Sequence, residues 1–146
     1  MWSVGPIEPT SAAGHKYCLC IVDSCTRWPA VYLLKSLTAK AVCEELKNLF
    51  MDVGVITSDQ GTNFTSSLTK ELLKMFGVAP RLNTLGHPES SGIVERWNKT
   101  FKKTTHHVII DNPRQWHKII PFTVWAIRDV PNATTGVAPY MQVYGR

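Results

Sequence analysis

Hydrophobic residues recur along the first half of the chain at spacings that change from strand-like to helix-like. Nearly continuous apolar runs at residues 17–23 and 29–34 predict two strands buried on both faces, and the short polar stretch between them predicts a hairpin. Apolar residues three or four apart predict a helix over residues 37–52, with Thr38 as its N-cap. A third strand is expected at residues 53–58.

The second half of the chain continues this alternation. A helix over residues 65–77 is expected to be capped by Thr65 or a neighbouring serine. Pro113 suits the first turn of the last long helix, and Pro121 should kink it. The other expected elements are an edge strand at 78–84, a loop at 85–92, a helix at 91–108, a helix at 112–130 and a surface loop at 131–146. This order predicts one α/β domain with a mixed sheet.

Composition narrows the function classes only modestly. The 146 residues carry a formal net charge of +5, which permits a polyanionic partner but also fits a solvated basic face. The four cysteines form no CxxC pair, which favours buried reduced thiols over a zinc site. No apolar run has the length of a membrane span, and the start of the chain does not resemble a signal peptide.

Two carboxylates are the strongest candidates for chemistry. Asp59 follows the third predicted strand in the stretch SDQGTNF, and 35 residues separate it from Glu95 on a predicted helix. One helix and one strand in that interval can bring the two acids together. Paired carboxylates need a neutralising cation, and oxygen ligands favour Mg²⁺ or Mn²⁺. Such ions activate water or a hydroxyl against phosphodiesters, although Asp59 is also a typical turn residue.

Lysines follow Glu95 on the same predicted helix. Lys99 and Lys102 stand four and seven residues beyond it, on the same face, and Lys103 is adjacent. This face could hold a metal and grip phosphates. It could equally be a solvated face with an ordinary Glu–Lys pair.

Three stretches together resemble the integrase core of Gypsy-type LTR retrotransposons and retroviruses. They are SDQGTNF, GHPESSGIVERWNKTFKK and TGVAPYMQVYGR, and the early stretch KYCLCIVDSCTRWPAVYLL fits the same family. The resemblance covers essentially the whole chain. It implies an RNase H-like fold, with a mixed central sheet flanked by helices, over a single domain at residues 1–146.

The same resemblance implies an Asp–Asp–Glu triad that binds two Mg²⁺ ions, 3′-end processing and strand transfer. Asp59 matches the second acid and Glu95 the third. The residues that match DNA-contacting positions are Asn63, His87, Asn98, Lys99, Lys102 and Lys103. The partners that the resemblance implies are the DNA ends of the element and the target DNA. It also implies self-association and a nuclear location. No membrane and no small-molecule substrate is expected.

The sequence departs from the family at two places. The position of the first acid, a few residues before Gly5-Pro6, holds Trp2, which cannot bind a metal. Asp23 does not replace it, because the family's second strand supplies no triad member. The link before Asp59 is also a few residues short, which could shift the strand that leads into it.

These departures predict an integrase core with a truncated first strand and lost or reduced catalysis. The family's N-terminal zinc-binding and C-terminal DNA-binding modules are not found in the sequence. One alternative is a non-enzymatic domain that binds nucleic acid or self-associates. The other is an unrelated RNase H-like nuclease, against which the long run of matching motifs speaks.

Overall fold

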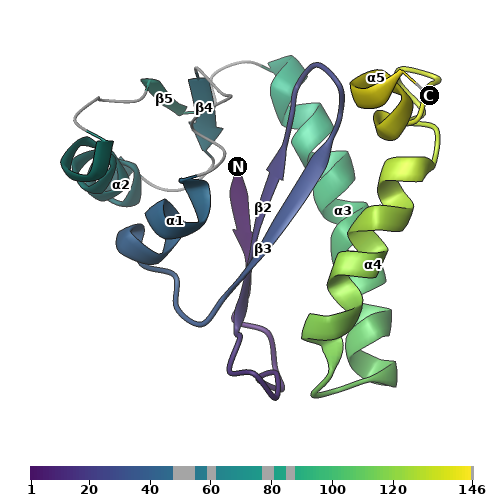
Figure 1. The fold of residues 1–146 in the computed structure, drawn as a ribbon, viewed down its shortest axis with the longest axis horizontal. Coiled ribbons are helices and arrows are strands. Elements are labelled where there is room, and N and C mark those ends of the chain that lie inside the picture. Colours follow the sequence, from purple (N-terminus) through teal and green to yellow (C-terminus); the bar gives the residue numbers. More distant parts are fainter. Residues whose placement is uncertain (48–54, 59–61, 77–80, 85–87, 146) are drawn as a thin grey trace.

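The computed structural model describes residues 1–47, 55–58, 62–76, 81–84 and 88–145. The strands in these residues are β1 (Trp2–Val4), β2 (Tyr17–Val22), β3 (Pro29–Leu34), β4 (Val55–Ser58) and β5 (Arg81–Thr84). The helices are α1 (Ala39–Leu46), α2 (Thr62–Phe76), α3 (Pro88–Asp111), α4 (Trp116–Asp129) and α5 (Pro139–Tyr144). Figure 1 shows α1 and α2 on one side of the β2–β3 hairpin, with α3 and α4 on the other.

The described strands form one antiparallel and one parallel ladder. β2 lies between β1 and β3, and both of its pairings are antiparallel. The hairpin that the sequence predicts is confirmed, with Tyr17 opposite Leu34. β4 pairs with β5 in parallel, so that Ser58 stands opposite Thr84. Both kinds of pairing therefore occur in this α/β fold, but the described strands form two separate sheets and not the single mixed sheet that the sequence predicts.

The core has two parts, one on each face of β2. Leu19 faces a cluster completed by α1 and α2, whose buried residues include Val42, Leu46, Leu68 and Leu72. Cys18 and Cys20 face a second cluster, whose other buried residues are Trp2, Ile7, Phe101, Trp116, Ile120 and Val124. Successive strand residues point to opposite faces. Burial on both faces is the reason why this strand reads as an uninterrupted apolar run.

The structure corrects two of the predicted helix starts. Thr38 caps α1 as expected, since its Oγ1 accepts a hydrogen bond from the Ala41 amide at 3.2 Å. However, α2 begins at Thr62, which places Thr65 inside the helix and rules it out as the cap. α3 begins at Pro88, so the second half of the predicted loop at 85–92 is helical. Proline has no amide hydrogen to leave unpaired, which makes it an ordinary residue at a helix start.

The C-terminal part departs further from the prediction. α4 begins at Trp116, so Pro113 lies in the preceding turn and not in the first turn of the helix. Pro121 does lie within α4. The expected surface loop contains α5, a short helix with Pro139 at its first turn. A six-residue helix with no capping side chain gives little sequence signal.

Arg128 ties α4 to the hairpin. Its Nε and Nη2 donate hydrogen bonds to the Pro29 carbonyl oxygen, at 3.0 and 2.7 Å. Its guanidinium carbon also lies 4.2 Å from the centre of the Trp28 ring. Burial lowers the pKa of Arg128, against the opposing influence of Tyr144 and Tyr32. The partly buried guanidinium of Arg128 is stabilised by its two hydrogen bonds and by the face of the Trp28 ring.

Trp2 joins β1 to α3 through an aromatic stack. Its side chain is only 1% exposed. The ring meets Trp97 edge to face, with centroids 5.3 Å apart, and Trp97 stacks on Phe101 at 4.9 Å. Aromatic side chains bury large apolar areas and gain further from such geometries. Trp2 is therefore part of the core and faces no solvent.

A substitution at Trp2 tests this packing. We expect Trp2→Asp to lower the free energy of unfolding by at least about 3 kcal/mol, because it leaves a cavity and buries a carboxylate. Trp2→Phe, the control, keeps an aromatic ring and should cost about 1 kcal/mol. Urea unfolding followed by far-UV circular dichroism measures both. Equal stability of the Trp2→Asp variant and the unchanged chain would show that Trp2 does not hold the core.

Candidate functional site

Several of the candidate residues lie on the solvent-exposed side of α3. Glu95, Lys99 and Lys102 are exposed and lie on one face of the helix, as their spacing predicts. Lys103 is exposed beside them. Asn98 is partly buried, and its Oδ1 has no hydrogen-bond partner among the described residues. One helix therefore presents an acid and three lysines to solvent.

The second carboxylate belongs to a segment next to β4. Asp59 follows Ser58, the last residue of β4, but Asp59 itself lies outside the described residues, as does His87. Asn63 lies in the first turn of α2, and its side chain is not described. The approach of Asp59 to Glu95 thus stays a prediction from the chain path.

Trp2 occupies the place where the resemblance expects the first acid. It lies on β1 opposite Cys20, inside the apolar cluster that contains Phe101. Its indole Nε1 is buried, and no partner for it is found in the described part of the chain. An indole offers a hard cation no oxygen ligand. The aromatic packing of Trp2 leaves this position without metal-binding chemistry.

Asp23 serves the hairpin turn. Its Oδ2 accepts hydrogen bonds from the amide and the hydroxyl of Thr26, at 2.8 and 2.6 Å. Partial burial works against ionisation, but the Thr26 bonds, with help from the Cys25 amide and the Arg27 charge, hold the pKa of Asp23 below its usual range. Aspartate commonly stabilises a turn by such bonds to nearby residues. It gives Asp23 a structural role and agrees with leaving it out of the triad.

The described residues do not by themselves form a metal site. Across residues 1–47, 55–58, 62–76, 81–84 and 88–145, no three His, Cys, Asp or Glu side chains gather closely enough to hold an ion. Burial raises the pKa of Cys18 to about 12 and that of Cys43 to about 11, which keeps both thiols protonated. With Trp2 in place of an acid, the described residues do not fit a two-metal centre. None of the described helices is long and apolar enough to cross a membrane.

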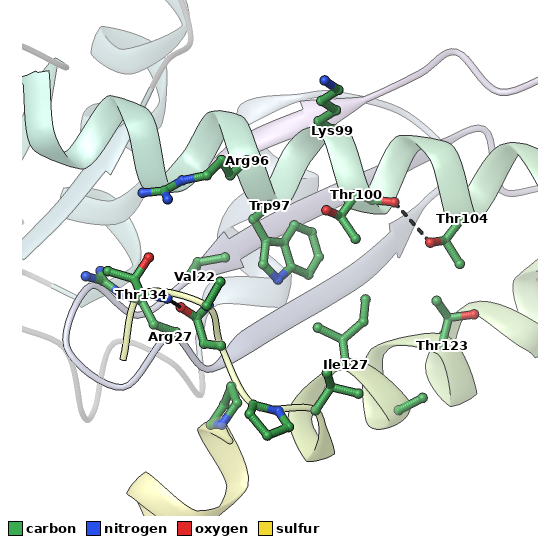
Figure 2. A pocket seen from close by; sticks show the side chains of 16 residues that line it. Val22, Arg27, Arg96, Trp97, Lys99, Thr100, Thr104, Thr123, Ile127 and Thr134 are labelled. Atoms are coloured by element: carbon green, nitrogen blue, oxygen red, sulfur yellow. Dashed lines mark hydrogen bonds between the residues drawn. The ribbon is translucent and has the colours of Figure 1, made fainter. Parts of the chain in front are cut away.

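A cavity beside α3 was not foreseen from the sequence. Figure 2 shows Trp97 pointing into it from α3 and Ile127 facing it from α4. Arg27 and Arg96 also line it. The sequence signal was weak, because Trp97 stands at core spacing, Arg27 stands alone in a turn, and Arg96 is one of several charged residues on α3. Only the packing of α3 against α4 brings these residues together.

The comparisons with known proteins agree with this fold. The family model described as "Integrase core domain" matches residues 4–88, and the match begins two residues after Trp2. The catalytic core domain of BIV integrase superposes with a TM-score of 0.65, covering 88% of this chain and 84% of that one. Its sequence identity is 20%, so this likeness speaks for the fold alone.

Several viral polyproteins are among the relatives of this chain. The Gag-Pol polyprotein of Walleye dermal sarcoma virus is 37% identical over 139 residues, which is 89% of this chain. The Pol polyprotein of Radiation murine leukemia virus (strain Kaplan) is 33% identical, and the Pro-Pol polyprotein of Simian foamy virus type 1 is 30% identical, over 90% and 97% of this chain. The chain spans only 8%, 23% and 12% of these three polyproteins. With more than half of its residues matched by the family model and an RNase H-like fold to agree with it, the chain belongs to the integrase core domain family.

Proposed function

We propose that this domain is a DNA-binding integrase core of an LTR retroelement whose strand-transfer chemistry is lost or much reduced. One observation carries the proposal: Trp2 stands where the family pattern has an acid, and its side chain is buried against Trp97. A two-metal mechanism needs carboxylates around both ions. An aromatic core residue cannot supply one. The same observation favours the alternative of a non-enzymatic remnant that binds nucleic acid or self-associates.

Two carboxylates of the inferred triad remain in the chain. Asp59 and Glu95 would hold the Mg²⁺ or Mn²⁺ that the family pattern implies, and such an ion would activate a nucleophile towards a phosphodiester. The support for this assignment is the path of the chain, because Asp59 directly follows β4 and Glu95 is exposed on α3. Two carboxylates can bind an ion weakly without completing the site.

DNA binding would be carried by the lysine face of α3. Lys99, Lys102 and Lys103 are exposed on one helix, in a chain with a net charge of +5. Exposed lysines bind phosphates by neutralising charge and releasing counterions, a contribution independent of the catalytic acids. Asn63, His87 and Asn98 are assigned to DNA on the family pattern. A nuclear location would follow from work on chromosomal DNA.

Self-association is proposed through the outer face of α4. Phe122 is 71% exposed and Trp125 is 62% exposed, three residues apart on this helix. Large aromatic side chains exposed together mark interaction surfaces more often than solvated ones. We assign this face to a second copy of the chain, because an integrase core acting on two DNA ends needs more than one copy.

Removal of two lysines tests the DNA face. We expect the Lys99→Gln/Lys102→Gln variant to bind a fluorescent DNA duplex more weakly and to flatten the plot of log Kobs against log salt by about 1.8, for two phosphate contacts. The control, Lys16→Gln/Lys118→Gln, removes the same charge from two exposed positions away from α3, one just before β2 and one on α4. Fluorescence anisotropy across a potassium chloride series measures both slopes. An equal loss in the control would assign DNA binding to the overall charge and contradict the α3 face.

Charge placed on α4 tests self-association. We expect the chain to sediment as a dimer and the Phe122→Lys/Trp125→Lys variant as a monomer, since two buried lysines would have no partners. Met141→Lys/Val143→Lys is the control, because it changes two exposed apolar residues on α5. Analytical ultracentrifugation provides the measurement. A monomeric parent chain, or a dimer that survives the α4 substitutions, would refute this interface.

A further inference from the structure

A cavity of about 680 Å³ lies between α3, α4 and the loop that joins α4 to α5. Val22 and Arg27, at the two ends of the turn between β2 and β3, close its third side. Its volume is within the range of about 300–1,000 Å³ typical of small-molecule sites. Figure 2 shows the Trp97 ring reaching into it, with Thr123 and Ile127 opposite. Lys99 is also among the lining residues, although its side chain extends away from the Trp97 ring.

The polar lining of the cavity is rich in hydrogen-bond donors. Arg27 and Arg96 bring two positive charges, and Figure 2 shows both side chains reaching towards the same end of the cavity. No aspartate or glutamate is found among the described residues that line it. The nearby Asp23 is engaged by Thr26 in the hairpin turn. Two guanidinium groups without a lining carboxylate suit an anion, and their planar forks match the oxygens of a phosphate.

Two of the lining residues have buried N–H groups without an acceptor. The Nε of Arg27 and the Nε1 of Trp97 are both buried and unpaired within the described part of the chain. The Nη1 of Arg27 donates to the Ser24 carbonyl, so only part of this side chain is used by the turn. Trp116, by contrast, donates its Nε1–H to the Pro9 carbonyl at 3.0 Å. Buried donors are rarely left unpaired, and acceptors from a ligand would complete these two after a small shift.

The remaining wall is flat and apolar. Trp97 is fixed in orientation because it stacks on Phe101 on one side and meets Trp2 edge to face. Ile127 and Pro131 extend the apolar surface across the cavity. An aromatic ring held in this way can receive the face of a nucleobase. The cavity thus combines an apolar wall with a cationic end.

We propose that this cavity binds a nucleotide, with its base against Trp97 and its phosphate at Arg27 and Arg96. The shared chemistry, a base joined to a phosphate, occurs both in a free nucleoside monophosphate and at the 5′-phosphorylated end of a DNA strand. The site meets the proposed DNA face only at Lys99, which is among the lining residues, whereas Glu95 and Lys102 do not line the cavity. The contacts proposed for the nucleotide, Trp97, Arg27 and Arg96, are neither catalytic acids nor lysines assigned to DNA.

Nuclear magnetic resonance detects this binding directly. The indole Nε1–H signal of Trp97 is assigned by its loss in Trp97→Phe, and dTMP is then titrated to millimolar concentration. We expect a saturable shift of the Trp97 signal, while the Trp116 signal, whose N–H is already paired, stays in place. Thymidine tests the base without the phosphate, and inorganic phosphate tests the phosphate without the base. Both should bind at least about tenfold more weakly than dTMP.

Substitutions locate the phosphate. We expect Arg27→Gln and Arg96→Gln each to weaken dTMP binding by about tenfold, since each removes a charged donor. Lys118→Gln is the matched control, because Lys118 is exposed on α4 and does not line the cavity. Circular dichroism confirms that each variant is folded. A 5′-phosphorylated oligothymidine that displaces dTMP from the Trp97 site would identify the strand end as the source, and failure to displace it would identify the free nucleotide.

Two results would overturn the proposal. One is the absence of a saturable shift of the Trp97 signal with both dTMP and the oligonucleotide. The other is equal weakening by Lys118→Gln and by the two arginine substitutions, which would reduce the binding to general charge attraction.

Discussion

The contact between Trp2 and Trp97 is the interaction on which the rest of this structure depends. It fastens the outermost strand of the antiparallel sheet to the middle of the long helix α3. Phe101, which stacks on Trp97, extends this aromatic contact into the cluster that also contains Trp116. This aromatic packing, together with the contact between α3 and α4, holds α3 against the core and leaves its lysine face exposed.

The same contact shows why the residue at position 2 can serve either metal binding or core packing. A carboxylate at the start of β1 would be stabilised by metal ions and destabilised by apolar neighbours. Trp2 has the opposite effect: its buried apolar side chain stabilises the core, and it provides no ligand for a metal ion. The exposed residues Glu95, Lys99 and Lys102 are unaffected, since they point away from the core. On the proposed function, such a domain would keep its surface for DNA and lack a carboxylate at position 2.

Much of the fold could be predicted from local patterns. The bounds of β3 and the Thr38 cap follow from an apolar run and a single hydroxyl, both of which act within a few residues. The start of α3 at Pro88 was missed because Ser90, Ser91 and Gly92 are of types common in loops, whereas in the structure they belong to the helix. β1 is only three residues long, and its pairing with β2 makes it a strand.

The site was predictable where it depends on spacing along one helix, and not where it depends on packing between elements. Glu95 and the lysines share a face because helix geometry requires it. The burial of Trp2 and the cavity between α3 and α4 need the tertiary arrangement, and no local pattern encodes them. The approach of Asp59 to Glu95 stays a prediction.

The most direct test of the central claim is DNA strand joining by the unaltered chain on a branched DNA substrate in Mn²⁺. Glu95→Gln is assayed in parallel, and DNA binding is measured in the same reactions, so that a lack of products is not confused with a lack of bound substrate. Our account predicts bound DNA and no joined product from either protein. Joined product from the unaltered chain that disappears with Glu95→Gln would contradict it, because an active metal centre would then exist without an acid at position 2.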